Sequence, residues 1–366
     1  MQTLTPLSQT ITSWVHKAFA PFRKTVRSNL ALFLPALLSS ALEPTLSDLA
    51  RRIPLSIQAQ SRLNRLWRFL RHPTLQNPWT LTAHLLPLLL PRFPKTQPLP
   101  LLVDWTDGED GVHKALVAAL PLRGRTLWVA FELHPLTPWP SQNRVEEEFL
   151  YRLGRTVQAL GYTPLFILDR GFDRVTLMRR LKAWGMGFLI RLRRHREVRT
   201  KTGERFVLGE EYAEEVKPWR GRVDLSGHAG DTVEVELFLA QGKREPWYLA
   251  FWSPLDWEPG GYRLRMWIEE GFRDLKGAGF GLHRHRLRSG ASLRGWLWLL
   301  GLGMVLLVLL GEVLRGRGWL VDVVAYPERQ SLFRIARLAL AQGPPHWQRE
   351  AVAELGRLLQ ELGGEK

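Results

Sequence analysis

The stretch YRLRMWIEEGFRDLK, from Tyr262 to Lys276, carries the residue types and spacing that most strongly suggest chemistry. On an α-helix, at about 100° per residue, four of its polar side chains share one arc roughly 60° wide: Tyr262, Arg265, Glu269 and Lys276. A carboxylate flanked by two cations and a phenol makes a poor apolar contact and a plausible phosphate-handling surface. A solvated helix face of mixed charge has the same pattern, so Glu269 needs partners elsewhere in the chain.

Two aspartates supply such partners. Asp104 and Asp169 each follow three apolar residues, LLV and FIL, at the end of a predicted strand. Adjacent strands of an α/β sheet bring such side chains together beyond the strand ends, where their charges repel unless a cation lies between them. Two Mg²⁺ ions, or Mn²⁺ in their place, suit oxygen ligands and phosphodiester chemistry, and Glu269 would be a third ligand. The alternative for either aspartate is a turn former or a helix cap.

The composition favours a nucleic-acid partner. The 366-residue chain has 51 Lys and Arg against 35 Asp and Glu, a formal net charge of +16. A protein this basic usually binds a polyanion, and nucleic acid is a commoner polyanion than a membrane surface. The chain has no cysteine, which excludes disulfides, thiolate nucleophiles and cysteine zinc sites. His283 and His285 lack the further ligands that a zinc site needs.

Two segments bear on location. The first 42 residues contain no Asp or Glu, as targeting peptides do, but the apolar run Leu30–Leu38 begins too late for a secretory signal. The apolar stretch Gly295–Gly311 is at the lower length limit for a membrane span, and a helix buried in a large core has the same composition. We therefore expect a buried core helix and a cytoplasmic protein without a membrane segment.

The spacing of apolar residues predicts a mixed α/β fold. Strand-length runs end at Asp104 and Asp169, and helical patterns cover Asn143–Leu160 and about Asp173–Trp184. Gly-containing turns between short apolar runs then indicate an all-β insertion. The predicted segments are a helical DNA-binding region at 1–95, the α/β core at 96–190, the insertion at 191–255, the rest of the core at 256–314, and a short helical tail at 315–366.

Two basic clusters lie outside the acidic motifs. The predicted helix Ser61–Pro73 has an apolar back and a row of arginines, among them Arg62 and Arg65. The stretch LHRHRLRSG, Leu282–Gly290, contains no acid and carries three arginines: Arg284, Arg286 and Arg288. Both clusters are candidate contacts to the DNA backbone. An arginine-decorated bundle helix and a solvated basic loop are the respective alternatives.

Three motifs resemble the catalytic motifs of DDE transposases: LLVDWTD around Asp104, ILDRGFD around Asp169 and YRLRMWIEEGFRDLK around Glu269. The last matches the Y-x2-R-x3-E-x6-K signature of one bacterial insertion-sequence family, and the Asp-Arg-Gly-Phe at 169–172 matches the second motif of that family. The order of the three acids, with a β-insertion before the glutamate, is also similar. The resemblance covers about residues 45–310.

The resemblance implies a ribonuclease-H-like core in which Asp104, Asp169 and Glu269 hold two Mg²⁺ ions. It implies cleavage at transposon ends, attack by the freed 3′-hydroxyl on target DNA, a hairpin intermediate and a homodimer that pairs the two inverted repeats. Tyr262, Arg265, Lys276 and Arg170 would contact DNA. A Trp of the insertion, either Trp219 or Trp247, would stack on a flipped base, although a core role suits each as well. The tail is shorter than the dimerisation region of several relatives.

Two other functions remain open at this point. A ribonuclease-H-like nuclease without strand transfer, such as a junction resolvase, needs the same carboxylates. A catalytically silent DNA-binding protein derived from a transposon would share the basic surface without cutting DNA. The bacterial relatives further imply a cytoplasmic protein at the nucleoid.

Overall fold

The computed structural model describes residues 5–40, 43–137, 141–211, 218–227, 230–242, 245–277, 279–285 and 287–363. The chain divides into two units. Unit 1 comprises Met1–Pro91, Trp105–Trp139 and Trp267–Lys366, and unit 2 comprises Arg92–Asp104 and Pro140–Met266. One boundary therefore falls inside the first strand, and another falls near the start of the helix that carries Glu269.

Unit 1 is built around α11 (Gly290–Arg315), a helix with apolar side chains on every face. Such a helix must lie in a core or in a membrane. It is long and apolar enough to cross a membrane, and 89% of its most apolar window is buried inside the protein. The prediction of a buried core helix for Gly295–Gly311 is confirmed.

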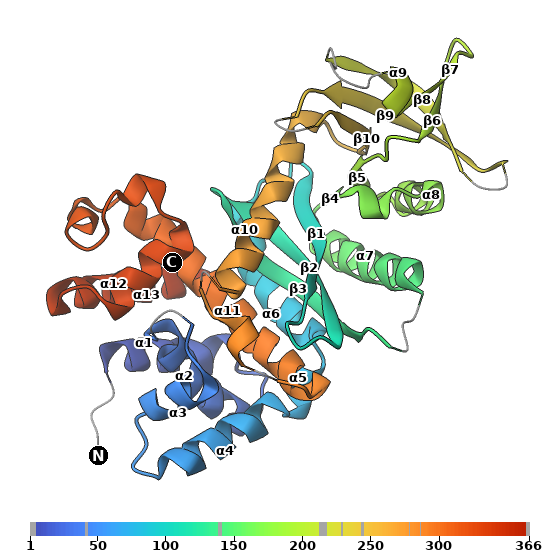
Figure 1. Ribbon diagram of the computed structural model, residues 1–366. Helices are drawn as coiled ribbons and strands as arrows, with labels where there is room; N and C mark the ends of the chain where they lie inside the picture. Colours follow the sequence, from blue (N-terminus) through green and yellow to red (C-terminus); the bar gives the residue numbers. More distant parts are fainter. Residues whose placement is uncertain are drawn as a thin grey trace. The chain divides into compact units, whose positions relative to one another are not determined.

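Short helices pack around α11 (Figure 1). It contacts α2, α4, α5, α12 and α13. A Cβ on Gly311 would lie 1.9 Å from the Leu332 carbonyl oxygen, so only glycine permits the close approach of α12. The helices are α1 (Pro6–Ala18), α2 (Lys24–Leu38), α3 (Leu46–Arg52), α4 (Ala59–Leu70), α5 (Pro73–Gln76), α6 (Trp79–Leu89), α10 (Met266–Leu275), α12 (Leu332–Ala341) and α13 (Pro345–Leu362).

Unit 1 also contains an antiparallel hairpin of β2 (His113–Leu122) and β3 (Arg125–Pro135). The middle of each strand is buried on both faces, and α6 and α11 both pack against β3. The hairpin thus joins the helical part of the unit through one apolar core. Short 3₁₀ turns complete the unit: η5 (Leu282–Arg284), η6 (Gly318–Asp322) and η7 (Pro327–Arg329).

Unit 2 contains one mixed sheet with the strand order β1-β4-β5-β10-β9-β8-β6-β7. The first three strands are parallel and the others antiparallel. Helix α7 (Gln142–Ala159) packs on β4, and α8 (Val175–Ala183) packs on β5 and β9 (Figure 1). The strands are β1 (Leu99–Asp107), β4 (Pro164–Leu168), β5 (Gly187–Arg191), β6 (Glu197–Thr200), β7 (Arg205–Val207), β8 (Trp219–Ser226), β9 (Thr232–Ala240) and β10 (Trp247–Trp252).

The mixed α/β class is confirmed, with two differences from the sequence analysis. Strand β1 continues to Asp107, so Asp104 lies inside the strand rather than at its end. The strands of the predicted insertion continue the sheet, because β10 pairs antiparallel with β5. One helical turn, α9 (Leu208–Glu211), interrupts them. Strand β10 pairs with a strand far back in the chain, since Leu249 lies opposite Arg191, 58 residues earlier. Local sequence patterns do not reveal such a pairing.

Candidate active site

The two aspartates occupy matching positions on the parallel strands of unit 2. Leu102 of β1 pairs with Ile167 of β4, and two residues further along each chain stand Asp104 and Asp169. The side chain of Asp104 is 14% exposed and that of Asp169 is 33% exposed. The Asp169 Oδ1 atom accepts a hydrogen bond of 2.8 Å from Gly171 N, which caps the 3₁₀ turn η2 (Arg170–Phe172). Asp169 is therefore both a helix cap and a partly exposed carboxylate.

The guanidinium of Arg265 lies near the carboxylates of both Asp104 and Asp169. Its Nη2 atom donates to Asp104 Oδ2 at 2.7 Å and lies 3.8 Å from Asp169 Oδ2. A guanidinium in this position lowers the repulsion between two neighbouring negative charges. From the sequence we expected a divalent cation between the aspartates and a DNA contact for Arg265. In this structure the guanidinium itself occupies the position between them.

Tyr262 and Arg265 lie on η4 (Pro259–Arg265), a 3₁₀ segment. The prediction of a single α-helix through both residues is wrong, because α10 begins only at Met266. The two side chains still share a side, since a 3₁₀ helix has about three residues per turn. The buried ring of Tyr262 packs edge-on against Trp247, with the ring centroids 5.3 Å apart. Burial raises the pKa of Tyr262 to about 12, so its hydroxyl stays a neutral donor.

Glu269 and Lys276 belong to unit 1. Glu269 lies half-buried in the first turn of α10, and Lys276 follows the last residue of that helix. The Lys276 Nζ atom pairs with Glu109 Oε1 at 2.5 Å. Helix α10 thus carries Glu269 of the predicted triad, whereas Lys276 forms an ion pair with Glu109, which lies in the turn after β1.

The opposite face of α10 fixes its rotation on the β2–β3 hairpin. Asp274 pairs with Arg125 Nε at 2.6 Å. Burial raises the pKa of Asp274 to about 6, and the charge of Arg125 counteracts that rise. A Cβ on Gly271 would lie 2.5 Å from Thr126 Oγ1, so the helix needs glycine there to sit against β3. These contacts determine which face of α10 presents Glu269.

The pair formed by Asp104 and Asp169 fits a hard divalent cation. Carboxylate oxygens are the ligands that Mg²⁺ and Mn²⁺ prefer, and both aspartates already lie against one positive group. Among the residues that the structure describes, no three His, Asp or Glu side chains gather at metal-ligand spacing. The geometry thus supplies two of the three predicted ligands at one place.

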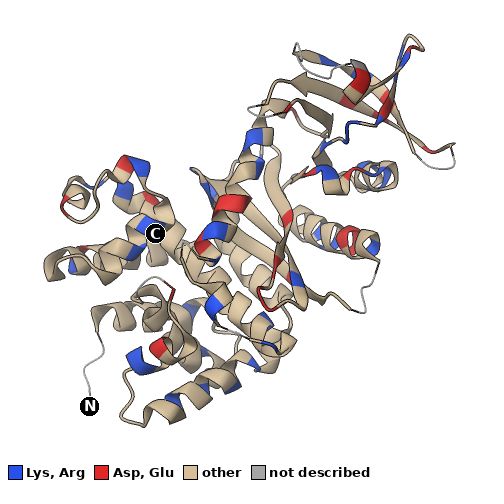
Figure 2. Cartoon of the chain, in the orientation of Figure 1, with Lys and Arg blue, Asp and Glu red and all other residues tan. Residues whose placement is uncertain are grey.

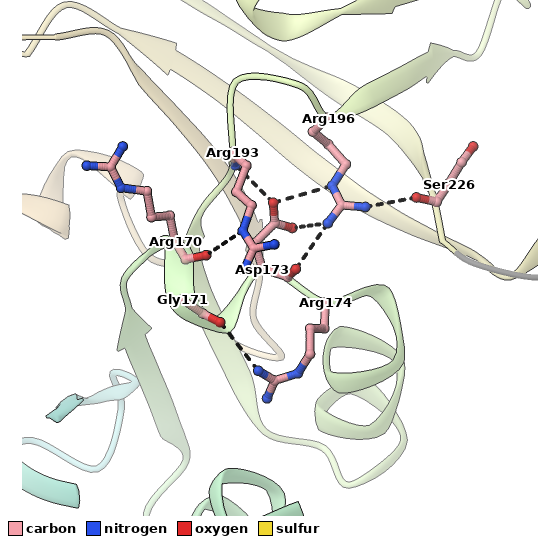
Figure 3. Close-up of polar contacts among 7 residues, drawn as sticks. All are labelled: Arg170, Gly171, Asp173, Arg174, Arg193, Arg196 and Ser226. Carbon is pink, nitrogen blue, oxygen red and sulfur yellow. Dashed lines mark hydrogen bonds and ion pairs between the residues drawn. The ribbon is translucent and has the colours of Figure 1, made fainter. Parts of the chain in front are cut away.

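The turn that carries Asp169 is held by two buried ion pairs that the sequence analysis missed. Asp173 Oδ1 accepts a 2.6 Å hydrogen bond from Arg196 Nη2, and Asp173 Oδ2 accepts one of 2.9 Å from Arg193 N (Figure 3). On the other side, Arg174 Nη2 lies 2.6 Å from the fully buried carboxylate of Glu146 in α7. The run RLRRHR after β5 was the only sequence signal for these contacts.

Several predicted DNA contacts have internal partners. Arg62 donates to the carbonyl oxygens of Ile57, Arg51 and Ile53, and Arg65 Nε donates to Asn29 Oδ1 at 2.7 Å. Arg62 thereby stabilises the end of α3, as an arginine of a bundle helix does. Figure 2 shows the basic positions along α4.

The other predicted contacts are more exposed. Arg170 lies 3.5 Å from Glu245, and Arg284 lies 3.4 Å from Glu43. Arg288 is exposed, and Arg286 lies outside the described residues. Of the two candidate tryptophans, Trp219 is an exposed aromatic on β8, whereas Trp247 contacts Tyr262.

Comparison with known families bears on the same residues. Residues 141–307 match the model of the transposase DDE domain family. This match supports a DDE transposase. The matched range contains Asp169 and Glu269, together with Tyr262, Arg265 and Lys276, and it begins after Asp104. No curated protein matches the sequence at a significant level.

Proposed function

We propose that this protein is a DNA transposase of the DDE type with a ribonuclease-H-like core, and that Asp104, Asp169 and Glu269 are its catalytic acids. One observation carries the proposal: Asp104 and Asp169 stand at matching positions of neighbouring parallel strands and lie against the same guanidinium. The family match over residues 141–307 supports it independently. Glu269 completes the set by its place in the signature, four residues after Arg265.

Each residue has a role that suits its chemistry. Asp104, Asp169 and Glu269 would hold two Mg²⁺ ions, or Mn²⁺ in their place. When bound, such ions activate an attacking oxygen and stabilise the leaving oxygen of a phosphodiester. Tyr262, whose pKa is about 12, donates a hydrogen bond to phosphate and keeps its proton at neutral pH. Arg265 and Lys276 supply positive charge to phosphate oxygens near the scissile bond.

The proposed reaction is cut-and-paste transposition. The enzyme binds the terminal inverted repeats, and water cuts one strand at each end. The freed 3′-hydroxyl would attack the opposite strand, which closes a hairpin and releases the flanking DNA. Water would then reopen the hairpin, and the regenerated 3′-hydroxyl would attack a phosphodiester of the target DNA. The helical segment at 1–95 and the basic stretch at 282–290 would bind double-stranded DNA outside the cleavage site. Trp219 or Trp247 would stack on a flipped base, a homodimer would pair the two ends, and the protein would act in the bacterial cytoplasm at the nucleoid.

A strand-transfer assay tests this function against its nearest rival. Labelled DNA carrying the inverted repeats that flank the coding region is incubated with the protein, Mg²⁺ and a supercoiled target plasmid. A transposase yields labelled product joined to the plasmid. Cleavage of the labelled end without any joined product would identify a nuclease that lacks strand transfer and would overturn the proposal.

A catalytically silent DNA-binding protein is the second candidate. It is favoured by the position of Arg265 Nη2, 2.7 Å from Asp104 Oδ2 and 3.8 Å from Asp169 Oδ2, where a guanidinium already neutralises the two acids. Calorimetric titration with Mn²⁺, in the presence of end DNA, separates the two functions. A transposase binds the ion through the three acids, and an Asp169→Asn variant binds it more weakly. If titration of the wild-type protein with Mn²⁺ released no more heat than dilution of the ion alone, the catalytically silent DNA-binding protein would be favoured.

A further inference from the structure

The loop after β5 concentrates positive charge beside the turn that carries Asp169. Together with Arg191, the last residue of β5, this loop reads RLRRHR up to Arg196 and contains four arginines and a histidine. The basic run is visible between β5 and β6 in Figure 2. Its first and last arginines are largely buried in ion pairs, Arg191 with Glu245 at 2.9 Å and Arg196 with Asp173 at 2.6 Å. The residues between them are exposed, except for a buried leucine.

Among the residues that the structure describes, Arg193 and Arg194 differ from the neighbouring arginines because neither forms an ion pair with Asp or Glu. From Arg170 to Arg205 the chain has ten arginines, and eight of them form an ion pair with Asp or Glu: Arg170, Arg174, Arg179, Arg180, Arg191, Arg196, Arg199 and Arg205. Within the described part of the chain, no carboxylate pairs with Arg193 or Arg194. Two adjacent exposed cations raise the local positive potential, which attracts an anion.

The backbone of this loop is held by a buried carboxylate. The side chain of Asp173 is 0% exposed, and it accepts hydrogen bonds from Arg193 N and from Arg196 (Figure 3). Arg196 Nη1 also donates to the Ser226 carbonyl oxygen at 3.0 Å, which anchors the loop to the end of β8. The position of Arg193 is therefore set before any ligand arrives, which lowers the entropy cost of binding.

Each of the two guanidinium groups is tethered by one nitrogen. Arg193 Nε donates to the carbonyl oxygen of Arg170, at 3.3 Å, and Arg170 is the residue directly after Asp169 (Figure 3). Arg194 Nη2 donates to the Gly209 carbonyl oxygen at 3.3 Å. A guanidinium has five N–H donors in a planar fork that matches phosphate oxygens. Both side chains retain donors for such a ligand beyond these tethers.

We propose that Arg193 and Arg194 form a phosphate-binding site for the backbone of the DNA strand that enters at Asp169. The site rests on the proposed transposase function and adds two residues to it. Arg193 is a DNA-contacting residue beside the Asp169 turn, to which it is tethered through the Arg170 carbonyl oxygen, and Arg194 extends the contact toward α9. Asp173 and Arg196 act as positioning residues, because they hold the loop through Arg193 N and Ser226 O.

Salt-dependent binding tests this proposal on the full chain. The affinity for a fluorescein-labelled duplex of arbitrary sequence is measured by anisotropy over a series of KCl concentrations, for wild type, Arg193→Gln and Arg194→Gln. The matched control is Arg220→Gln, which removes the same charge from an exposed arginine that pairs with Glu236 at 2.7 and 3.0 Å. The slope of log K against log [KCl] is negative, and each lost phosphate contact reduces its magnitude by about 0.9.

The proposal predicts that Arg193→Gln and Arg194→Gln each weaken binding roughly five- to tenfold near 0.1 M salt and flatten the slope. Arg220→Gln should change both quantities much less. Equal effects from all three variants would mean that only net charge matters and would overturn the site. Failure of the wild-type protein to bind the duplex at any salt concentration would instead overturn the proposed function itself. Thermal melting of each variant establishes that it is folded.

Discussion

The Arg265 Nη2 atom lies 2.7 Å from Asp104 Oδ2, within hydrogen-bonding distance of the largely buried carboxylate. The same nitrogen is 3.8 Å from Asp169. One arginine thereby offsets the repulsion that would otherwise separate the two acids. A divalent cation at this place would compete with the guanidinium for the same oxygens.

That competition gives the first prediction. Arg265→Gln removes the charge partner of Asp104 and should lower the free energy of unfolding by about 1–3 kcal/mol without divalent ions. Mn²⁺ should raise the melting temperature of the variant more than that of wild type, because the ion replaces the lost charge. Differential scanning fluorimetry measures both effects. Arg263→Gln, at an exposed arginine of the same 3₁₀ segment, is the control. An equal response to Mn²⁺ in wild type and Arg265→Gln would contradict the competition.

The second prediction concerns the buried pair of Asp173 and Arg196. Removal of one partner leaves the other buried and uncompensated, so Asp173→Asn and Arg196→Gln should each cost about 3–5 kcal/mol. The double variant should cost clearly less than the sum of the two. Urea unfolding of the four proteins gives the coupling free energy. Strictly additive losses would show that the two side chains do not stabilise each other.

The third prediction tests the seat of α10. In Gly271→Ala the added Cβ atom would lie 2.5 Å from Thr126 Oγ1. This overlap should destabilise the protein by about 1–3 kcal/mol. Thr126→Ala removes the clashing atoms and should restore part of the loss in the double variant. Unfolding in urea again provides the measurement. If Gly271→Ala is as stable as wild type, the close approach does not determine the rotation of α10.

The fourth prediction concerns pH. His285 is buried, with its ring edge-on to Trp296, and burial lowers the pKa of His285 from 6.5 to about 4, with His283 and Arg284 adding to the effect. Because the folded state binds fewer protons than the unfolded state in this range, the contribution of His285 is fully present above about pH 6.5 and is lost as the pH falls toward 4.

The change should reach up to about 3 kcal/mol. It is isolated by comparison with His285→Phe, which keeps a ring and cannot titrate. The difference in unfolding free energy between wild type and the variant should shift against wild type as the pH falls. A difference that stays constant between pH 4 and 6.5 would place the pKa of His285 at its unfolded value.

Local patterns predicted the elements well and their ends less well. The helix predicted at Asn143–Leu160 is observed at Gln142–Ala159, because its apolar spacing is regular. Helix α8 begins at Val175 rather than near Asp173. The Asp173 side chain does not cap the helix, because it accepts hydrogen bonds from Arg196 Nη2 and Arg193 N. That partnership depends on chain segments about 20 residues away, which periodicity does not reveal.

The candidate site was predictable in its residue types and less so in its contacts. The apolar runs before Asp104 and Asp169 and the signature that begins at Tyr262 pointed to the two acids that now share Arg265 and to Glu269 on α10. Arg265 as the group between the aspartates was not foreseen, because an ion pair 161 residues apart in sequence leaves no local pattern. The change from 3₁₀ to α-helix at Met266 was missed for a related reason, since both conformations suit the same residues.

The most direct measurement is Mg²⁺-dependent nicking of end DNA by Asp104→Asn, Asp169→Asn and Glu269→Gln. Each variant keeps the shape of the side chain and removes its charge, so binding of the labelled end should remain near that of wild type. Nicking should fall by at least about a thousandfold in every variant, since loss of a group that acts only in the transition state appears in the rate. Near wild-type nicking by any one of the three would contradict the assignment of these acids as the catalytic set.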